Sequence, residues 1–386
     1  MRTVELTDLR RARTYFVCES CAIMVDCAFV LPSANAWAQA LAAHLTFMLC
    51  ALLPMSILLY HIVPGRARTL MGIVIALASG VGTPMVIDHF RASHSVSWMT
   101  AFLASTFGFH AFFKSLAAAF GSYPEGADAN LGTWVLWFTS LPEPRFAKGK
   151  LLRAPGGSLA KRVLLFLLKA LSLVVILSGL QNSPRGAPFG DDGTWARCML
   201  NGGVHLWLVF LWASFCLDVG NILVLLQGAS ADPGFRNPLL ASRSFKEAWG
   251  ERWNLPVHLF LKRSVYTPAR SCGISRVPAA LITFFCSGLL HEYNFSIHNH
   301  EAYQPGHATV FFMTMGMMMM MEDTVGRAAP AVVRRTWNAL PDAIIAMLIQ
   351  STVLPFFTPL FFRSWVEAGM LESVAELVPH VKCDRT

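Results

Sequence analysis

The sequence predicts an all-α polytopic membrane protein, with about eight transmembrane helices (seven to nine) and a short amphipathic helix at the membrane interface. Composition is the first reason: 54% of the 386 residues are hydrophobic and 14% are charged, whereas soluble domains carry roughly 25% charged residues. The mean hydropathy of +0.48 is the second. The third is a series of apolar runs close to the length of about 20 residues that a membrane helix needs.

These apolar runs follow one another along most of the chain. Proline, glycine or charged residues bound many of them, as at the ends of membrane helices. The eight runs that we expect to cross the bilayer are 38–63, 70–87, 96–120, 164–180, 202–227, 278–297, 307–322 and 343–362. A ninth crossing would use residues 15–31, where Glu19 and Asp26 interrupt the apolar pattern.

The distribution of the runs predicts one membrane-embedded domain over residues 1–386, with 1–37 as a separate N-terminal segment and 242–297 as the region that carries the motifs. The net charge of +8 is spread over the loops, so we expect contact with lipid headgroups and no nucleic-acid partner. Basic residues are densest in the connections 145–161 and 246–276. Since such loops favour the cytoplasmic side, we expect both on the cytosolic face.

The cysteines and histidines do not predict a metal site. Cys18, Cys21 and Cys27 lie close together, but no nearby histidine or further cysteine pair completes a zinc site. We therefore expect reduced thiols packed in or near a helix. The histidines that follow the sixth apolar run lack the repeated close spacing of a di-iron site, so no metal is expected.

The polar segment 244–254 predicts a short helix. Ser244 and Glu247 have the spacing of a capping box, which starts a helix, and Pro256 prevents smooth continuation. Phe245, Trp249 and Trp253 fall at i, i+4 and i+8 and form one aromatic stripe. We therefore expect an amphipathic helix in the interface plane with its indoles turned inward.

Asn254 closes this segment and gives it a second interpretation. The simpler one is a membrane-surface helix without a site. An amide beside buried indoles, however, needs a polar partner. Asn254 is therefore a candidate for substrate contact.

His291 is the second candidate, in the run 278–297. Pro278 suits a first helical turn, and His291 follows 13 residues later, about 20 Å along a helix. Ser287 lies one turn earlier on the same face, and Glu292 adds an ionisable group at depth. An intramembrane histidine is a functional-site hypothesis, although a bond to another helix would also explain it.

The motifs in this region resemble a known family. The pattern Ser-Phe-x-x-x-Trp-Gly-x-Arg-Trp-Asn at 244–254 is followed by Val-Tyr-x-Pro at 265–268 and Ser-Gly-Leu-Leu-His-Glu at 287–292. This order is similar to that of the plant-type wax synthases, the long-chain-alcohol O-fatty-acyltransferases of the membrane-bound O-acyltransferase superfamily. The similarity covers 242–293. Ala248 and Glu251 depart from it, since the family commonly has Phe and a basic residue there.

The resemblance implies a fold like that of these acyltransferases and transfer of an acyl group from acyl-CoA, as co-substrate, to a long-chain alcohol. Imidazole suits a general base near neutral pH, so His291 would take the hydroxyl proton. Asn254 would orient the acyl donor or stabilise the oxyanion. The remaining expected substrate-binding residues are Trp249, Arg252, Trp253, Ser287 and Glu292. No cofactor or metal is required.

The resemblance leaves several questions open. Basic residues near the motif would meet either CoA phosphates or lipid headgroups; they are Lys246, Arg252, Lys262 and Arg263. Relatives with similar motifs esterify sterols, terpenoid alcohols or diacylglycerol, so the acceptor could belong to one of those classes. A membrane transporter with a polar pathway is a more distant alternative. The family and a neutral-lipid role imply a multi-pass protein of the endoplasmic reticulum membrane.

Overall fold

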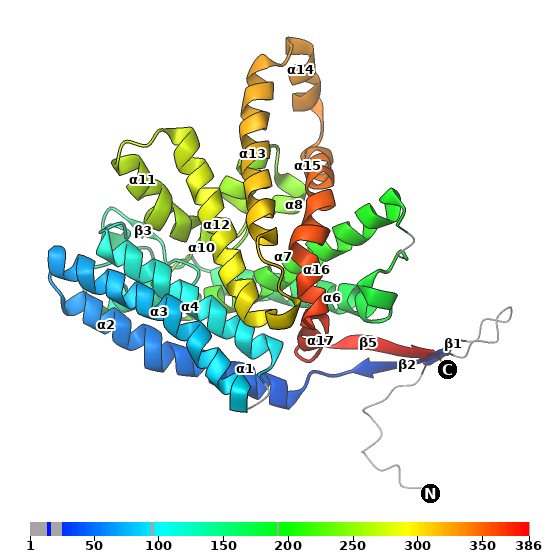
Figure 1. The fold of residues 1–386 in the computed structure, drawn as a ribbon, viewed down its shortest axis with the longest axis horizontal. Helices are drawn as coiled ribbons and strands as arrows, with labels where there is room; N and C mark the ends of the chain where they lie inside the picture. The colour runs from blue at the N-terminus through cyan, green and yellow to red at the C-terminus, as the bar shows by residue number, and fades with distance from the viewer. Residues whose placement is uncertain (1–13, 17–24, 94–95, 191–192, 386) are drawn as a thin grey trace, which may run out of the picture.

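A bundle of helices forms the body of the protein, and a small β ribbon extends from it (Figure 1). The structure is a computed structural model that describes residues 14–16, 25–93, 96–190 and 193–385. The helices are α1 (Ala34–Phe47), α2 (Leu53–His61), α3 (Arg66–Ser93), α4 (Trp98–Ala119), α5 (Leu131–Thr139), α6 (Ser158–Gln181), α7 (Trp195–Leu226), α8 (Pro238–Ala241), α9 (Phe245–Glu247), α10 (Leu255–Leu261), α11 (Thr267–Ser271), α12 (Arg276–His298), α13 (His307–Ala328), α14 (Ala331–Ala339), α15 (Asp342–Phe357), α16 (Arg363–Glu367) and α17 (Met370–Ala375).

Five helical runs of the described chain are long and apolar enough to cross a membrane: Ala34–His61, Arg66–Ala92, Ser158–Gln181, Trp195–Leu226 and Asp342–Glu367. They correspond to five of the eight predicted crossings. The other three predicted crossings fall on α4, α12 and α13, which are helices of 22, 23 and 22 residues. The polytopic helical class is thus confirmed, while the number of crossings stays a prediction.

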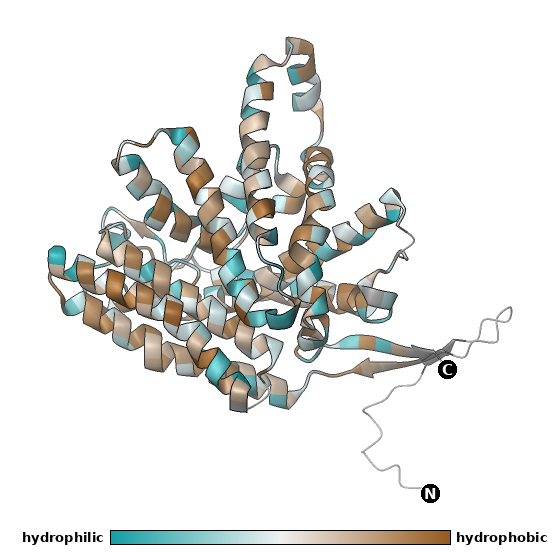
Figure 2. Cartoon of the chain, viewed as in Figure 1, coloured by the Kyte–Doolittle hydropathy of each residue, from teal (hydrophilic) through white to brown (hydrophobic). Residues whose placement is uncertain are grey.

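The outer surface of the bundle is suited to lipid. Hydrophobic residues run along the surface helices (Figure 2). On α3 the exposed large side chains form one stripe with helical spacing: Leu70, Val74, Leu77, Val81 and Met85. An apolar stripe of this length on a water-facing surface would be an association site. In a membrane protein it is the face that contacts the bilayer.

Small residues bring helices into close contact. A side chain at Gly72 would come within 2.8 Å of Ala119, and one at Gly108 within 2.5 Å of Thr83. These two contacts lie at opposite parts of the α3–α4 pair and hold the helices antiparallel. Close packing through small residues is the usual way in which membrane helices associate.

Hydrogen bonds to the backbone join the connections at one end of the bundle: the Arg145 backbone N–H donates to the Ser230 carbonyl, and the Ser122 hydroxyl donates to the Arg263 carbonyl. The other end carries the ribbon, in which β2 (Val25–Val30) pairs antiparallel with β1 (Thr14–Phe16) and β5 (His380–Arg385). A second, two-stranded sheet joins β3 (Phe146–Ala147) to β4 (Lys150–Leu151).

The ribbon corrects two predictions. Residues 25–30 form a strand that pairs with β1 on one side and with the C-terminal strand β5 on the other, so the suggested ninth helical crossing at 15–31 is wrong. Cys27 forms a disulfide with Cys383 and is therefore not a reduced thiol in a helix. The sequence separation of 356 residues hid this pairing. Cys18 and Cys21 lie outside the described residues.

Candidate active site

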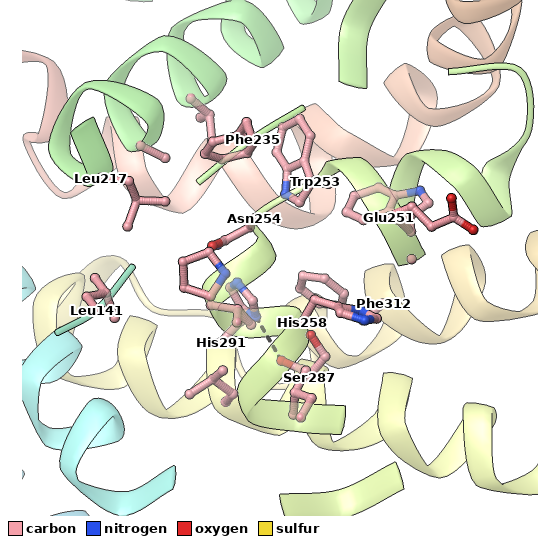
Figure 3. A pocket seen from close by; sticks show the side chains of 18 of the residues that line it. Leu141, Leu217, Phe235, Glu251, Trp253, Asn254, His258, Ser287, His291 and Phe312 are labelled. Carbon is pink, nitrogen blue, oxygen red and sulfur yellow. Dashed lines mark hydrogen bonds between the residues drawn. The ribbon is translucent and has the colours of Figure 1, made fainter. Parts of the chain in front are cut away.

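One large cavity occupies the interior of the bundle. Its volume is about 2060 Å³, well above the ~300–1,000 Å³ of ordinary small-ligand pockets. Helices α4, α7, α10, α12 and α13 all contribute to its walls, and both Asn254 and His291 line it. Figure 3 shows these two side chains among the lining residues, one from the start of α10 and the other from α12. The pair thus meets in one hollow, as the motif spacing suggested.

His291 is held in a defined orientation by its own helix. Its Nδ1 lies 2.8 Å from the Ser287 carbonyl oxygen (Figure 3). A carbonyl can only accept, so Nδ1 carries the proton and Nε2 presents a lone pair. Within the described part of the chain, no hydrogen bond occupies Nε2. The imidazole is therefore arranged to accept a proton from a ligand.

Aromatic rings fix the plane of the imidazole. Phe312 stacks on it with ring centroids 4.3 Å apart and an interplanar angle of 27°. Phe361 and Phe295 lie at 5.3 Å and 6.0 Å. These three rings come from separate segments of the chain, and their apolar faces keep the surroundings of His291 poor in competing hydrogen-bond partners.

Asn254 owes its position to a left-handed backbone turn. Its φ of 40° places it in the region that asparagine tolerates better than most residues. There it precedes α10, and its carbonyl accepts from the His258 N–H at 3.0 Å. Pro256 sits in the first turn of α10, so the proline starts a new helix. Among the described residues, the Asn254 side-chain amide has no hydrogen-bond partner.

The segment before Asn254 departs from the predicted continuous helix. Ser244 accepts from the Glu247 N–H at 2.9 Å, so the predicted cap is present. Helix α9 then gives way to a π-helical turn, Ala248–Arg252, and Trp253 is extended with ψ of 129°. The physical reason is that the Trp253 indole packs on Phe235 (centroids 5.3 Å, edge to face). Trp249 and Trp253 both line the cavity, so their indoles face inward.

The remaining predicted site residues divide into two groups. Ser287 lines the cavity and orients His291 through its carbonyl. Arg252 instead bonds Glu247 and the Arg236 carbonyl, both at 2.8 Å. Among the described residues, neither Arg252 nor Glu292 lines the cavity.

Glu292 has a structural explanation that its sequence position did not show. Its carboxylate accepts from the Tyr303 hydroxyl at 2.7 Å and from the N–H groups of Gly306 (3.1 Å) and Thr309 (2.8 Å). These amides belong to the first turn of α13, where a carboxylate is favourable. Glu292 therefore secures α13, the helix that presents Phe312 to His291.

The basic residues near the motif also differ in what they contact. Lys246 and Lys262 line the cavity. Arg263 instead bonds Glu143 at 2.7 Å, and Lys114 bonds the same carboxylate at 3.0 Å. Burial alone would raise the pKa of Glu143, but the positive charges of Lys114 and Arg263 outweigh it and lower the pKa below its ordinary 4.5. This ion cluster ties α4 to the segment that follows α10.

Sequence reasoning missed the aromatic frame of His291 and the first helix of the cavity wall. Phe312 and Phe361 are ordinary members of apolar runs, and no local pattern sets them apart. On α1, the cavity-lining residues Trp37, Leu41 and His44 keep helical spacing, but the helix is apolar overall, and its few polar residues are spread over more than one face. Only the tertiary structure reveals which face meets the cavity.

Comparison with known proteins gives the family of this region. The profile of the membrane-bound O-acyltransferase family matches residues 186–349, which include Asn254 and His291. A probable long-chain-alcohol O-fatty-acyltransferase 9 from Arabidopsis thaliana is 30% identical over 179 residues, 44% of this chain and 51% of the relative. A second, number 8, is 31% identical over 177 residues, 44% and 49%.

A different acyltransferase also matches. Diacylglycerol O-acyltransferase 1-1 from Oryza sativa subsp. japonica is 35% identical over 89 residues, 23% of this chain and 16% of the relative. The chain spans about half the length of the curated long-chain-alcohol relatives that it matches. The resemblance read from the motifs is confirmed for the matched region.

Proposed function

We propose, from the place of residues 186–349 in the membrane-bound O-acyltransferase family, that this chain transfers a fatty acyl group from acyl-CoA to a long-chain alcohol. The products are a wax ester and free CoA. The observation that carries the proposal is that His291 and Asn254 line one cavity, and that among the residues the structure describes neither Nε2 nor the Asn254 amide has a hydrogen-bond partner.

The chemistry follows from these two groups. The alcohol oxygen attacks the thioester carbonyl while Nε2 of His291 takes the hydroxyl proton. Negative charge then develops on the carbonyl oxygen, and the N–H groups of the Asn254 amide donate to it. Collapse breaks the carbon–sulfur bond, and the imidazolium returns its proton to the CoA thiolate. No covalent acyl-enzyme is needed.

Other parts of the cavity suit the two substrates. Lys246 and Lys262 line it near the basic end of the bundle, where they would meet CoA phosphates. Burial, with the nearby charges of Lys262 and Arg236, lowers the pKa of His258, which also lines the cavity, so this imidazole stays neutral. Trp249, Trp253 and the surrounding apolar walls would contact the hydrocarbon chains.

The same reasoning gives a membrane orientation. The basic connections would lie in the cytosol, the side from which acyl-CoA would arrive. The disulfide end would then face an oxidising lumen, where disulfides persist. Both assignments agree with a multi-pass protein of the endoplasmic reticulum membrane.

Diacylglycerol is the second candidate acceptor, because a diacylglycerol O-acyltransferase is among the relatives. Expression in a host that lacks neutral lipids, fed separately with fatty alcohol, sterol or diacylglycerol, distinguishes the acceptors. We expect alkyl esters from the alcohol feeding, resolved by lipid class. If only triacylglycerol or sterol esters form, the acceptor is diacylglycerol or a sterol and not a fatty alcohol. If no ester of any class forms, the proposed activity is wrong.

A further inference from the structure

Two polar side chains without partners line the cavity beyond His291. Asn294 lies on the same face of α12, about 4.5 Å farther along the helix axis than His291. Thr106 lines the cavity from α4. Among the residues that the structure describes, neither the Asn294 amide nor the Thr106 hydroxyl has a hydrogen bond. The proposed mechanism uses neither group.

The packing of α4 on α12 brings these two side chains to a similar depth. Nδ1 of His298 lies 3.5 Å from Oγ of Ser105, and a Cβ at Gly108 would lie 3.0 Å from the Tyr293 hydroxyl oxygen. The two helices are therefore antiparallel here. Both free side chains fall between these two contacts, so they face the cavity from neighbouring helices within about one helical turn in depth.

The free hydroxyl of Thr106 has a local cause. A threonine in a helix often returns its hydroxyl to its own backbone. Thr83 and Thr283 do so, since each donates to the carbonyl four residues earlier, at 2.9 Å and 2.7 Å. The corresponding carbonyl for Thr106 is that of Phe102, which accepts from the Ser105 hydroxyl at 3.0 Å. The Thr106 hydroxyl therefore remains available to a ligand.

The Asn294 amide is equally available. Its Oδ1 is buried without a partner, so the nitrogen is the end of the amide that a ligand in the cavity can reach. The neighbouring wall residues Phe109 and Phe295 have rings and offer no acceptor. A polar group enclosed in this way nearly always has a partner. An alkyl chain alone would leave both the amide and the Thr106 hydroxyl unpaired.

We infer that Asn294 and Thr106 bind a second oxygen atom of the acceptor, on a carbon close to the one that bears the reacting hydroxyl. The amide N–H groups donate to this oxygen, and the Thr106 hydroxyl donates to it or accepts from it. The two oxygens are close because Asn294 follows His291 by less than one helical turn. The inference rests on the proposed function and narrows its acceptor to long-chain alcohols with a second oxygen near the first.

Such an oxygen belongs to a free hydroxyl, as in a long-chain diol, or to an ester, as in a glyceride. The test compares three acceptors with one acyl-CoA: a long-chain 1-alkanol, the 1,2-alkanediol of the same length, and the 2-O-acetyl ester of that diol. Acylation of the 1-hydroxyl is measured. The kcat/KM of the diol or of its ester should exceed that of the alkanol about three- to tenfold, the factor that one hydrogen bond supplies. The better of the two identifies the second oxygen.

Two variants and two matched controls locate the effect. Asn294→Leu and Thr106→Val should each lower this ratio about three- to tenfold, toward equal use of the acceptors. Thr283→Val should keep the wild-type ratio, because Thr283 also lines the cavity but its hydroxyl already donates to the Ala279 carbonyl. Ser296→Leu, on the exposed side of α12, should keep it as well. A wild-type ratio near one, wild-type ratios in both variants, or an equal fall in either control would overturn the inference.

A binding measurement keeps the inference testable if no ester forms. The full chain in detergent is heated with each acceptor at saturation and without acyl-CoA. The diol or its ester should raise the Tm of the wild type more than the alkanol does. Asn294→Leu should abolish this difference, and Ser296→Leu should retain it. Equal shifts from all three acceptors in the wild type would reject the subsite. The expected difference without esterification would reject only the proposed reaction.

Discussion

His291 and α1 border the same cavity, but they are held in opposite ways. The imidazole is enclosed by aromatic rings from three segments and fixed through Nδ1. Helix α1 has no buried residue within the described chain; hydrogen bonds hold its Ser33–Trp37 end, and near its other end the rings of His44 and Phe47 contact Phe107. The difference shows that one cavity can have a rigidly held reacting group and a loosely held wall. A reacting group needs fixed geometry, whereas a wall along an alkyl chain needs only shape and apolar contact.

The largest effect is expected at the reacting imidazole. His291→Gln keeps a polar side chain but removes the base, so the rate of ester formation by purified protein should fall about 10²–10⁴-fold. His300→Asn is the control, since His300 is exposed and lies just beyond α12. Wild-type rates from His291→Gln, with thermal unfolding unchanged, would show that the enclosed region is not the reaction centre.

The next effect concerns the ion cluster that braces this region. Glu143→Gln leaves Lys114 and Arg263 without their carboxylate, and Glu143 is only 3% exposed. The free energy of unfolding in detergent should drop by about 3–5 kcal/mol. Asp232→Asn, in the half-exposed pair with Arg145, should cost less than about 1 kcal/mol.

The sign of the pH dependence follows from the lowered pKa of Glu143. The stabilisation is complete above the ordinary carboxyl pKa of 4.5 and is lost as the pH falls through the lower folded value. A wild-type protein that loses stability at low pH no faster than Glu143→Gln would contradict this role.

A somewhat smaller effect on the rate is expected when the side-chain amide of Asn254 is removed. Asn254→Gly keeps a residue that adopts positive φ and removes the donor, so kcat should fall about 10²-fold. Asn237 has a φ of 52° and also precedes a helix, α8. Asn237→Gly therefore changes the backbone in the same way away from the cavity and should retain activity. Equal losses from both variants would assign the effect to the backbone.

An effect on stability alone is expected at the ribbon, on the α1 side of the comparison. Cys27→Ser should lower the free energy of unfolding by about 2–4 kcal/mol, because the disulfide restricts the unfolded chain. Reductant should lower the melting temperature of the wild type and not that of Cys27→Ser. Cys198→Ser, at an exposed free cysteine, is the control. A reductant effect as large in Cys27→Ser would exclude this bond as its cause.

The predictable parts of the molecule were local. Apolar runs located the long helices, and Ser244 and Pro278 indicated helix starts that the structure contains. Motif spacing and resemblance together brought Asn254 and His291 to one cavity. The helix starts depend on residues within a few turns of one another, whereas the Asn254–His291 pair was found through the resemblance.

The unpredicted parts depend on distant residues. The sequence does not reveal that Glu292 secures the start of α13, because its partners are defined by the α12–α13 turn. The Cys27–Cys383 bond joins the two ends of the chain. The cavity face of α1 is equally hidden, since the polar residues of this helix, among them Gln39 and His44, do not lie on one face.

A structure with a non-reactive acyl-CoA analogue and a long-chain alcohol would test the central claim most directly. We expect the hydroxyl oxygen within hydrogen-bond distance of Nε2 of His291, with the acyl carbonyl oxygen facing the Asn254 amide. A complex in which the carbonyl lies away from both side chains, while the protein still esterifies the alcohol, would contradict it.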